Sequence, residues 1–159
     1  MRIGPYSRGT AVCALVLLLS GCGVSQKAGR TVGLRNDPRF LVHVNVANGA
    51  NNNNPVAMDL VLVLDKNLVK EVAKLSAKDW FERRMQIQRD MPGKSEIVSW
   101  EWVPGQSAGP IAVAVNPATK GAFVFASYLN PGDHRAAIDV RSPVVIQLQD
   151  ERFSVQAVR

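Results

Sequence analysis

Short apolar runs alternate with turn residues from Phe40 to the end of the chain. Turns such as Pro104-Gly105 and Asn130-Pro131-Gly132 recur at intervals of about ten residues, a spacing typical of a small β-sandwich or barrel. The sequence therefore predicts a mainly β fold, with strands at residues 40–47, 56–65, 96–103, 111–115, 122–129, 137–140, 144–148 and 153–158.

The predicted strand at residues 56–65 is apolar on both faces. Its even-numbered face carries Met58 to Leu64 in alternation, and its other face carries Val61 and Val63. Such a strand is usually central in its sheet or covered on both sides. The core between two sheets is therefore expected to contain Met58, Leu60, Leu62, Phe123, Phe125 and at least one of Trp100 and Trp102.

After this strand the apolar period changes to that of a helix. Leu68, Val72 and Leu75 follow an i, i+4, i+7 pattern, and residues 76–79 (Ser-Ala-Lys-Asp) resemble a capping box that begins a second helical segment. Pro92-Gly93 ends that segment. The sequence predicts a short helical insertion after the second strand.

The N-terminal region has the pattern of a lipoprotein signal. Arg2 and Arg8 precede an unbroken apolar run at residues 11–19, and Leu19-Ser20-Gly21-Cys22 resembles a bacterial lipobox. We expect residues 1–21 to be a signal peptide, Cys22 to carry covalent lipid, residues 22–38 to form a flexible tether, and residues 39–159 to form the β-sandwich domain. An ordinary signal peptide with an incidental cysteine is the alternative.

The remaining composition argues against several classes of function. Lys and Arg outnumber Asp and Glu by 19 to 13, but the basic residues are scattered, so no nucleic-acid surface is predicted. The only thiols are Cys13 and Cys22, and the only imidazoles are His43 and His134. These residues supply neither metal-ligand spacing nor a nucleophile with its base. We expect no enzyme activity, no metal, no small-molecule substrate, and no cofactor beyond the lipid on Cys22.

An asparagine-rich loop separates the first two predicted strands. It is long for a hairpin connection and offers hydrogen-bonding amides without charge. A partner-binding loop, presented by the flanking strands without help from its own side chains, and a plain exposed turn both fit this composition. The tryptophans at 100 and 102 similarly fit either a core ladder or a partner-facing patch. The candidate partner-binding residues are Asn48, Gly49, Ala50, Asn51, Asn52, Asn53, Asn54 and Pro55.

The order of these features resembles the TssJ-type outer-membrane lipoproteins of type VI secretion systems. The resemblance rests on the lipobox, the tether, the loop that ends in Pro55-Val56, the helix with Trp80-Phe81, residues 103–106 (Val-Pro-Gly-Gln), and the late strand at 121–126 followed by Arg135. It covers roughly residues 42–148. The asparagine run, Gln106 and the two phenylalanines of 121–126 depart from the family pattern.

The resemblance implies a transthyretin-like two-sheet β-sandwich with a structural role. A TssJ-type protein would anchor the trans-envelope complex to the outer membrane by binding the periplasmic domain of TssM, the inner-membrane subunit. The loop 48–55 would carry much of that contact. Gly23, in place of an Asp after the cysteine, predicts the periplasmic leaflet of the outer membrane. The alternative is a pilotin-like or small ligand-binding periplasmic lipoprotein.

Overall fold

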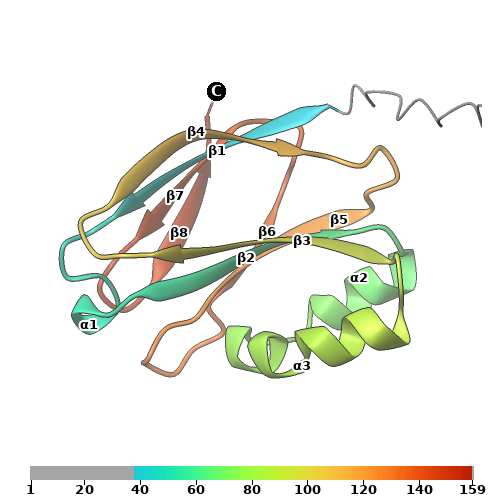
Figure 1. The fold of residues 1–159 in the computed structure, drawn as a ribbon, viewed down its shortest axis with the longest axis horizontal. Helices are drawn as coiled ribbons and strands as arrows, with labels where there is room; N and C mark the ends of the chain where they lie inside the picture. The colour runs from blue at the N-terminus through green and yellow to red at the C-terminus, as the bar shows by residue number, and fades with distance from the viewer. Residues whose placement is uncertain (1–37, 159) are drawn as a thin grey trace, which may run out of the picture. The chain divides into compact units, whose positions relative to one another are not determined.

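Two four-stranded sheets pack face to face in the computed structural model, which describes residues 38–158 (Figure 1). One sheet has the order β4-β1-β7-β8, and the other has the order β3-β2-β5-β6. The predicted signal peptide, Cys22 and residues 22–37 of the tether lie outside the described residues. The strands are β1 (Arg39–Val46), β2 (Val56–Val63), β3 (Ser95–Trp102), β4 (Ser107–Ala114), β5 (Gly121–Ala126), β6 (Arg135–Ile138), β7 (Val144–Leu148) and β8 (Phe153–Ala157).

All eight predicted strands are present, although some of their boundaries differ. Strand β4 begins at Ser107, four residues before the prediction, because Gly109-Pro110 lies within the strand. The pairing of β4 with β1 shifts register between Val42 and Val44, and this bulge accommodates the glycine and proline. Every strand pairing is antiparallel except that of β1 with β7.

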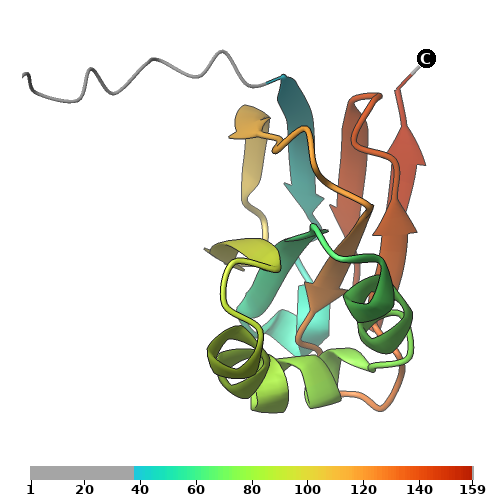
Figure 2. The same ribbon diagram turned by 90° about the vertical axis from the view of Figure 1, so that its right-hand side faces the viewer.

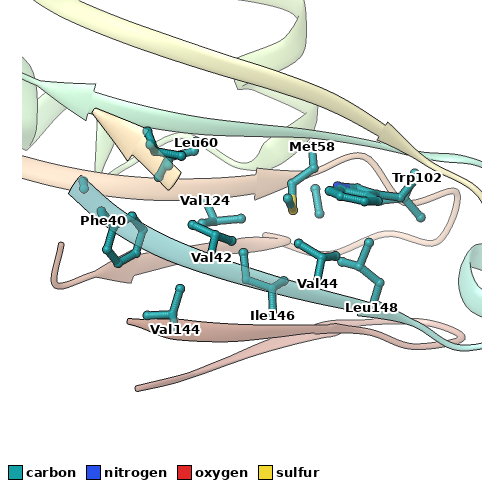
Figure 3. Packing of buried hydrophobic residues seen from close by; sticks show 14 of the residues in the cluster. Phe40, Val42, Val44, Met58, Leu60, Trp102, Val124, Val144, Ile146 and Leu148 are labelled. Carbon is teal, nitrogen blue, oxygen red and sulfur yellow. The ribbon is translucent and has the colours of Figure 1, made fainter. Parts of the chain in front are cut away.

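The main core fills the space between the two sheets. Strands β1 and β7 supply alternate side chains from one side, and β2, β3 and β5 supply them from the other (Figure 3). The predicted burial of Met58, Leu60 and Leu62 between the sheets is confirmed, because each is at most 1% exposed. Trp102 is also buried in this core. Trp100 is half-buried and packs against the same core, and the ring centroids of the two tryptophans lie 6.3 Å apart. Trp102 is thus a core residue.

A second core lies on the opposite face of the β2 sheet, under the helices. Phe123 and Phe125 are buried here, so the prediction that they lie between the two sheets is wrong. The alternation of β5 instead directs Ala122, Val124 and Ala126 between the sheets and places the larger rings beneath α2 and α3. The prediction that β2 is central and covered on both faces is confirmed.

The helical insertion consists of α2 (Lys66–Val72) and α3 (Ala77–Asp90). Asp65 caps α2 by accepting hydrogen bonds from the backbone N–H groups of Asn67 and Leu68. The predicted capping box is confirmed, since Ser76 and Asp79 exchange both bonds at the start of α3. Leu75 lies between the two helices, because α2 ends at Val72.

Candidate functional site

The asparagine run forms a tight left-handed turn between β1 and β2. Within α1 (Ala50–Asn53), residues Asn51, Asn52 and Asn53 have φ angles of 52°, 53° and 62°. Side chains other than glycine avoid this region for steric reasons, but asparagine tolerates it because its short amide can hydrogen-bond locally. The left-handed backbone therefore explains why asparagine recurs here.

Asn51 fixes this turn to two other loops. Its side-chain oxygen accepts a hydrogen bond from the Leu129 N–H at 2.7 Å, and its amide nitrogen donates to the Pro55 carbonyl at 2.9 Å. Its own backbone N–H donates to the Gln149 carbonyl at 3.2 Å. Asn51 is only 3% exposed. The expectation that the loop needs no help from its own side chains is wrong, because a buried amide holds it in place.

The predicted partner-binding residues divide into buried and exposed groups. Ala50 and Asn51 are buried and have no surface to offer a partner. The side chain of Asn54 is exposed but donates to the carbonyls of Asn51 and Asn52. The side chains of Asn52 and Asn53 make no hydrogen bond within residues 38–158. The exposed members are Asn48, Gly49, Asn52, Asn53, Asn54 and Pro55.

Four loops gather at this end of the sandwich, and we call residues 47–55, 103–106, 127–134 and 149–152 the loop end. Gly105 donates its N–H to the Ala47 carbonyl at 3.2 Å, which joins the β3–β4 turn to the asparagine loop. Leu129 and Val103 expose 67% and 56% of their surface here. Figure 1 shows α1 and the β5–β6 loop at the same end. The loop end thus combines the uncharged amides of the asparagine turn with two exposed apolar side chains, and its other loops carry the exposed charges of Asp133, Asp150, Glu151 and Arg152.

A cavity of about 570 Å³ lies between the start of α3 and the β5–β6 loop. Tyr128 and His134 stack in its wall with their ring centroids 4.8 Å apart. Burial raises the pKa of Tyr128 to about 12, so its hydroxyl stays protonated and donates to the Arg152 carbonyl at 2.9 Å. His134 Nε2 lies 3.0 Å from the Asn130 carbonyl, and Asp133 is paired with Arg135 at 3.6 Å. The neighbouring Asp133 and His134 thus form no catalytic pair.

Sequence reasoning missed a buried polar cluster beneath α3. Asp59 of β2 is 1% exposed, and its Oδ2 accepts hydrogen bonds from Trp80 Nε1 at 2.8 Å and Arg84 Nη1 at 2.6 Å. The Arg84 guanidinium also lies 4.9 Å from the ring centroid of Phe81. A lone acidic residue within an apolar strand was the signal that could have revealed it, since a buried charge requires a partner. The cluster fixes α3 to the sheet.

Two further features concern metal ions and membranes. The described residues contain no group of three or more His, Cys, Asp or Glu side chains that could hold a metal ion. Among the helices of residues 38–158, none is long and apolar enough to span a bilayer.

Comparison with known structures identifies the fold. Over 77% of this chain and 98% of the other, the lipoprotein TssJ1 of the type VI secretion system from Pseudomonas aeruginosa superimposes with a TM-score of 0.63 at 17% sequence identity. This chain has the TssJ fold. At such low identity the likeness establishes the fold alone, and both the predicted TssJ-type resemblance and the two-sheet sandwich are confirmed at that level. No protein-family model and no curated protein sequence matches the chain.

Two other structures share the TssJ fold with this chain. Serratia marcescens Lip, a membrane-bound component of the type VI secretion system, has a TM-score of 0.60 at 10% identity and covers 77% of this chain and 99% of its own. The second is a chain in a structure of the type VI secretion protein TssM C-terminal domain from EAEC. It has a TM-score of 0.54 at 14% identity, and the match covers 76% of this chain and 98% of that one. The chain therefore spans the full TssJ fold.

Proposed function

We propose that this protein is a non-enzymatic outer-membrane lipoprotein of a type VI secretion system. It anchors the trans-envelope complex by binding the periplasmic domain of a TssM-type inner-membrane subunit. The observation that carries the proposal is the TssJ fold, with structural neighbours that are type VI secretion lipoproteins. The lipobox at residues 19–22 supports the lipid anchor on Cys22.

The direction of β1 supports separate roles for the two ends of the sandwich, with membrane attachment at one end and partner binding at the other. The strand begins at Arg39 and runs to Val46, next to the asparagine loop (Figure 1). A strand of eight residues spans about 26 Å at roughly 3.3 Å per residue. Arg39, where the described strand begins, therefore lies at the end opposite the loop end. A lipid tether that joins the domain before Arg39 would leave the loop end available to a periplasmic partner.

The loop end offers the chemistry of a protein–protein interface. The exposed amides of Asn52 and Asn53 can hydrogen-bond to a partner, and Leu129 and Val103 provide apolar contact area. The turn is held by the three hydrogen bonds of Asn51, so it loses little conformational freedom on binding. A rigid loop of this kind suits a stable structural contact.

The deciding experiment is a binding measurement with a purified periplasmic fragment of the TssM-type subunit encoded by the same organism. We expect saturable binding of the mature protein, and co-purification of the two proteins from envelope extracts. Absence of both results would refute the proposal. Capture of an outer-membrane pore protein in place of the subunit would support the pilotin-like alternative.

A further inference from the structure

The sandwich has four edge strands, and they differ in how well they resist pairing with another chain. Strands β6 and β8 are short, with four and five residues. Strand β4 has eight residues, but it contains a bulge and Pro110, whose nitrogen lacks a hydrogen. Short strands, bulges and prolines are the usual protection of sheet edges. Strand β3 has eight residues with no proline, lysine, arginine or register shift.

The hydrogen-bond pattern shows which backbone groups of β3 face outward. The Leu64 N–H donates to the Lys94 carbonyl at 2.8 Å, and the same antiparallel register pairs the even-numbered residues of β3 with β2. Hydrogen-bonded and non-bonded pairs alternate along such a ladder. The N–H and C=O groups of Ile97, Ser99 and Glu101 therefore point away from β2. Within residues 38–158 no other strand lies beyond them.

We propose that the edge of β3 accepts an extended strand from the same periplasmic partner, so that the β2 sheet continues into the bound protein. This inference rests on the proposed function, because it names a second contact with that partner. Addition of a strand to an exposed sheet edge is a common mode of recognition, in which backbone hydrogen bonds supply the affinity.

The position of β3 makes this edge continuous with the loop end. Trp102, the last residue of β3, pairs with Val56 directly after the asparagine loop. The turn that follows is bonded to Ala47 through the N–H of Gly105. Figure 2 shows β3 and β4 on the same side of the sandwich. A partner that covers the loop end can thus extend along β3 without crossing another element.

The charge of β3 specifies the kind of strand that fits. Its only charged residues are Glu96 and Glu101, and both are exposed. Opposite charges on directly facing residues stabilise paired strands, whereas like charges destabilise them. The partner strand is therefore expected to carry Lys or Arg opposite Glu101.

Residue-resolved amide hydrogen exchange in the free and bound protein tests the inference. In the free protein, the N–H groups of Ile97, Ser99 and Glu101 should exchange rapidly, whereas those of Val98 and Trp100 should be protected by β2. Binding of the purified TssM-type periplasmic fragment should slow the first set at least tenfold. If the fragment binds and these three amides exchange at an unchanged rate, the inference is wrong while the proposed function stands.

A proline variant provides the matched test. Ser99→Pro removes one outward N–H at a position where an edge strand tolerates proline, and Ser99→Ala keeps that N–H. Ser99→Pro should weaken binding of the TssM-type fragment at least tenfold. Ser99→Ala should bind the fragment with nearly the affinity of the unsubstituted protein. The circular dichroism spectrum should be unchanged in both variants. Equal affinities would overturn the inference. Concentration-dependent dimerisation that Ser99→Pro abolishes, with fragment binding unaffected, would overturn it in favour of pairing between two copies of this chain.

Discussion

The indole Nε1 of Trp80 on α3 donates a 2.8 Å hydrogen bond to the buried carboxylate of Asp59 on β2. The two residues are 21 positions apart in the chain and join β2 to α3. Asp59 also accepts a hydrogen bond from Arg84, so one carboxylate oxygen accepts bonds from two side chains of the same helix. The packing of α3 on the sheet thus depends on a polar contact as well as on the second core.

Asp59→Ala should therefore destabilise the fold. The substitution leaves the Trp80 N–H buried without an acceptor, which costs about 1–3 kcal/mol. Chemical denaturation should show a lower midpoint for this variant. Asp139→Ala removes the exposed Asp139–Arg141 pair and serves as the control, with an unchanged midpoint expected. Equal midpoints for both variants would show that Asp59 contributes nothing to the attachment of α3.

Asn51→Ala should loosen the asparagine turn. The change removes two side-chain hydrogen bonds and places an alanine at a φ of 52°. A left-handed conformation costs a residue with a Cβ roughly 1–2 kcal/mol. Asn51→Gly removes the same bonds without that steric cost, so it should destabilise less. If the two variants have equal stability in thermal unfolding, the backbone strain assigned to this position is absent.

The double variant Asn52→Gly, Asn53→Gly isolates the exposed amides. Glycine adopts the left-handed conformation freely, so the fold should be retained. Affinity for the TssM-type periplasmic fragment should decrease at least tenfold, which corresponds to about 1.4 kcal/mol. Titration calorimetry checks this result, with Asn67→Ala on the exposed side of α2 as a control outside the loop end. Undiminished affinity would place the main contacts on other parts of the loop end.

Cys22→Ala should release the protein from the membrane or leave it unprocessed. Two or more acyl chains give stable attachment, because each buried CH₂ contributes roughly 0.8 kcal/mol. Fractionation of the envelope should find the unsubstituted protein in the outer membrane. Recovery of the alanine variant in the same fraction would contradict the prediction of a lipid anchor on Cys22.

Acid should destabilise the fold in part through the two carboxylates that cap α2 and α3. Hydrogen bonds from the backbone of Leu68 and Asn67 lower the pKa of Asp65, and the side chain of Ser76 lowers that of Asp79. A carboxyl group whose pKa is lower in the folded protein stabilises it above the unfolded pKa and loses that contribution as the pH falls. The unfolding temperature should hold from pH 7 to about 5 and decrease below about pH 4. Asp79→Asn should reduce that decrease. If this variant and the unsubstituted protein lose the same unfolding temperature on acidification, Asp79 does not contribute to the acid sensitivity.

The sequence pattern predicted the strands well because alternation and turn residues are local signals. It failed at β5, because both faces of this strand carry apolar residues. Only the position of the helices decides whether the face with Phe123 and Phe125 lies between the sheets or beneath α2 and α3. It also began the strand β4 four residues late, at residue 111, since the bulge at Gly109-Pro110 has the local composition of a turn. Bulges depend on the partner strand, which local sequence does not reveal.

The position of the asparagine turn was predictable from the sequence, but its construction was not. Four consecutive asparagines marked the loop, yet nothing in them distinguishes the buried Asn51 from the exposed Asn52. That distinction arises from Leu129, which is 78 residues away in the chain and donates to Asn51. The acidic residue of β2 was visible in the sequence, but its partners on α3 became evident only in three dimensions.

The pairing of β1 has a consequence for how the chain reaches its final state. This first strand has no hydrogen-bonded neighbour in its sheet before β4, and its parallel partner β7 ends at Leu148. Contacts so distant in sequence form late, because long loops must close first. The leading strand thus stays without its complete sheet until nearly the whole domain has been delivered. If the protein is exported as the lipoprotein proposed above, this delay helps its passage, since early closure of the sheet would block a translocation channel.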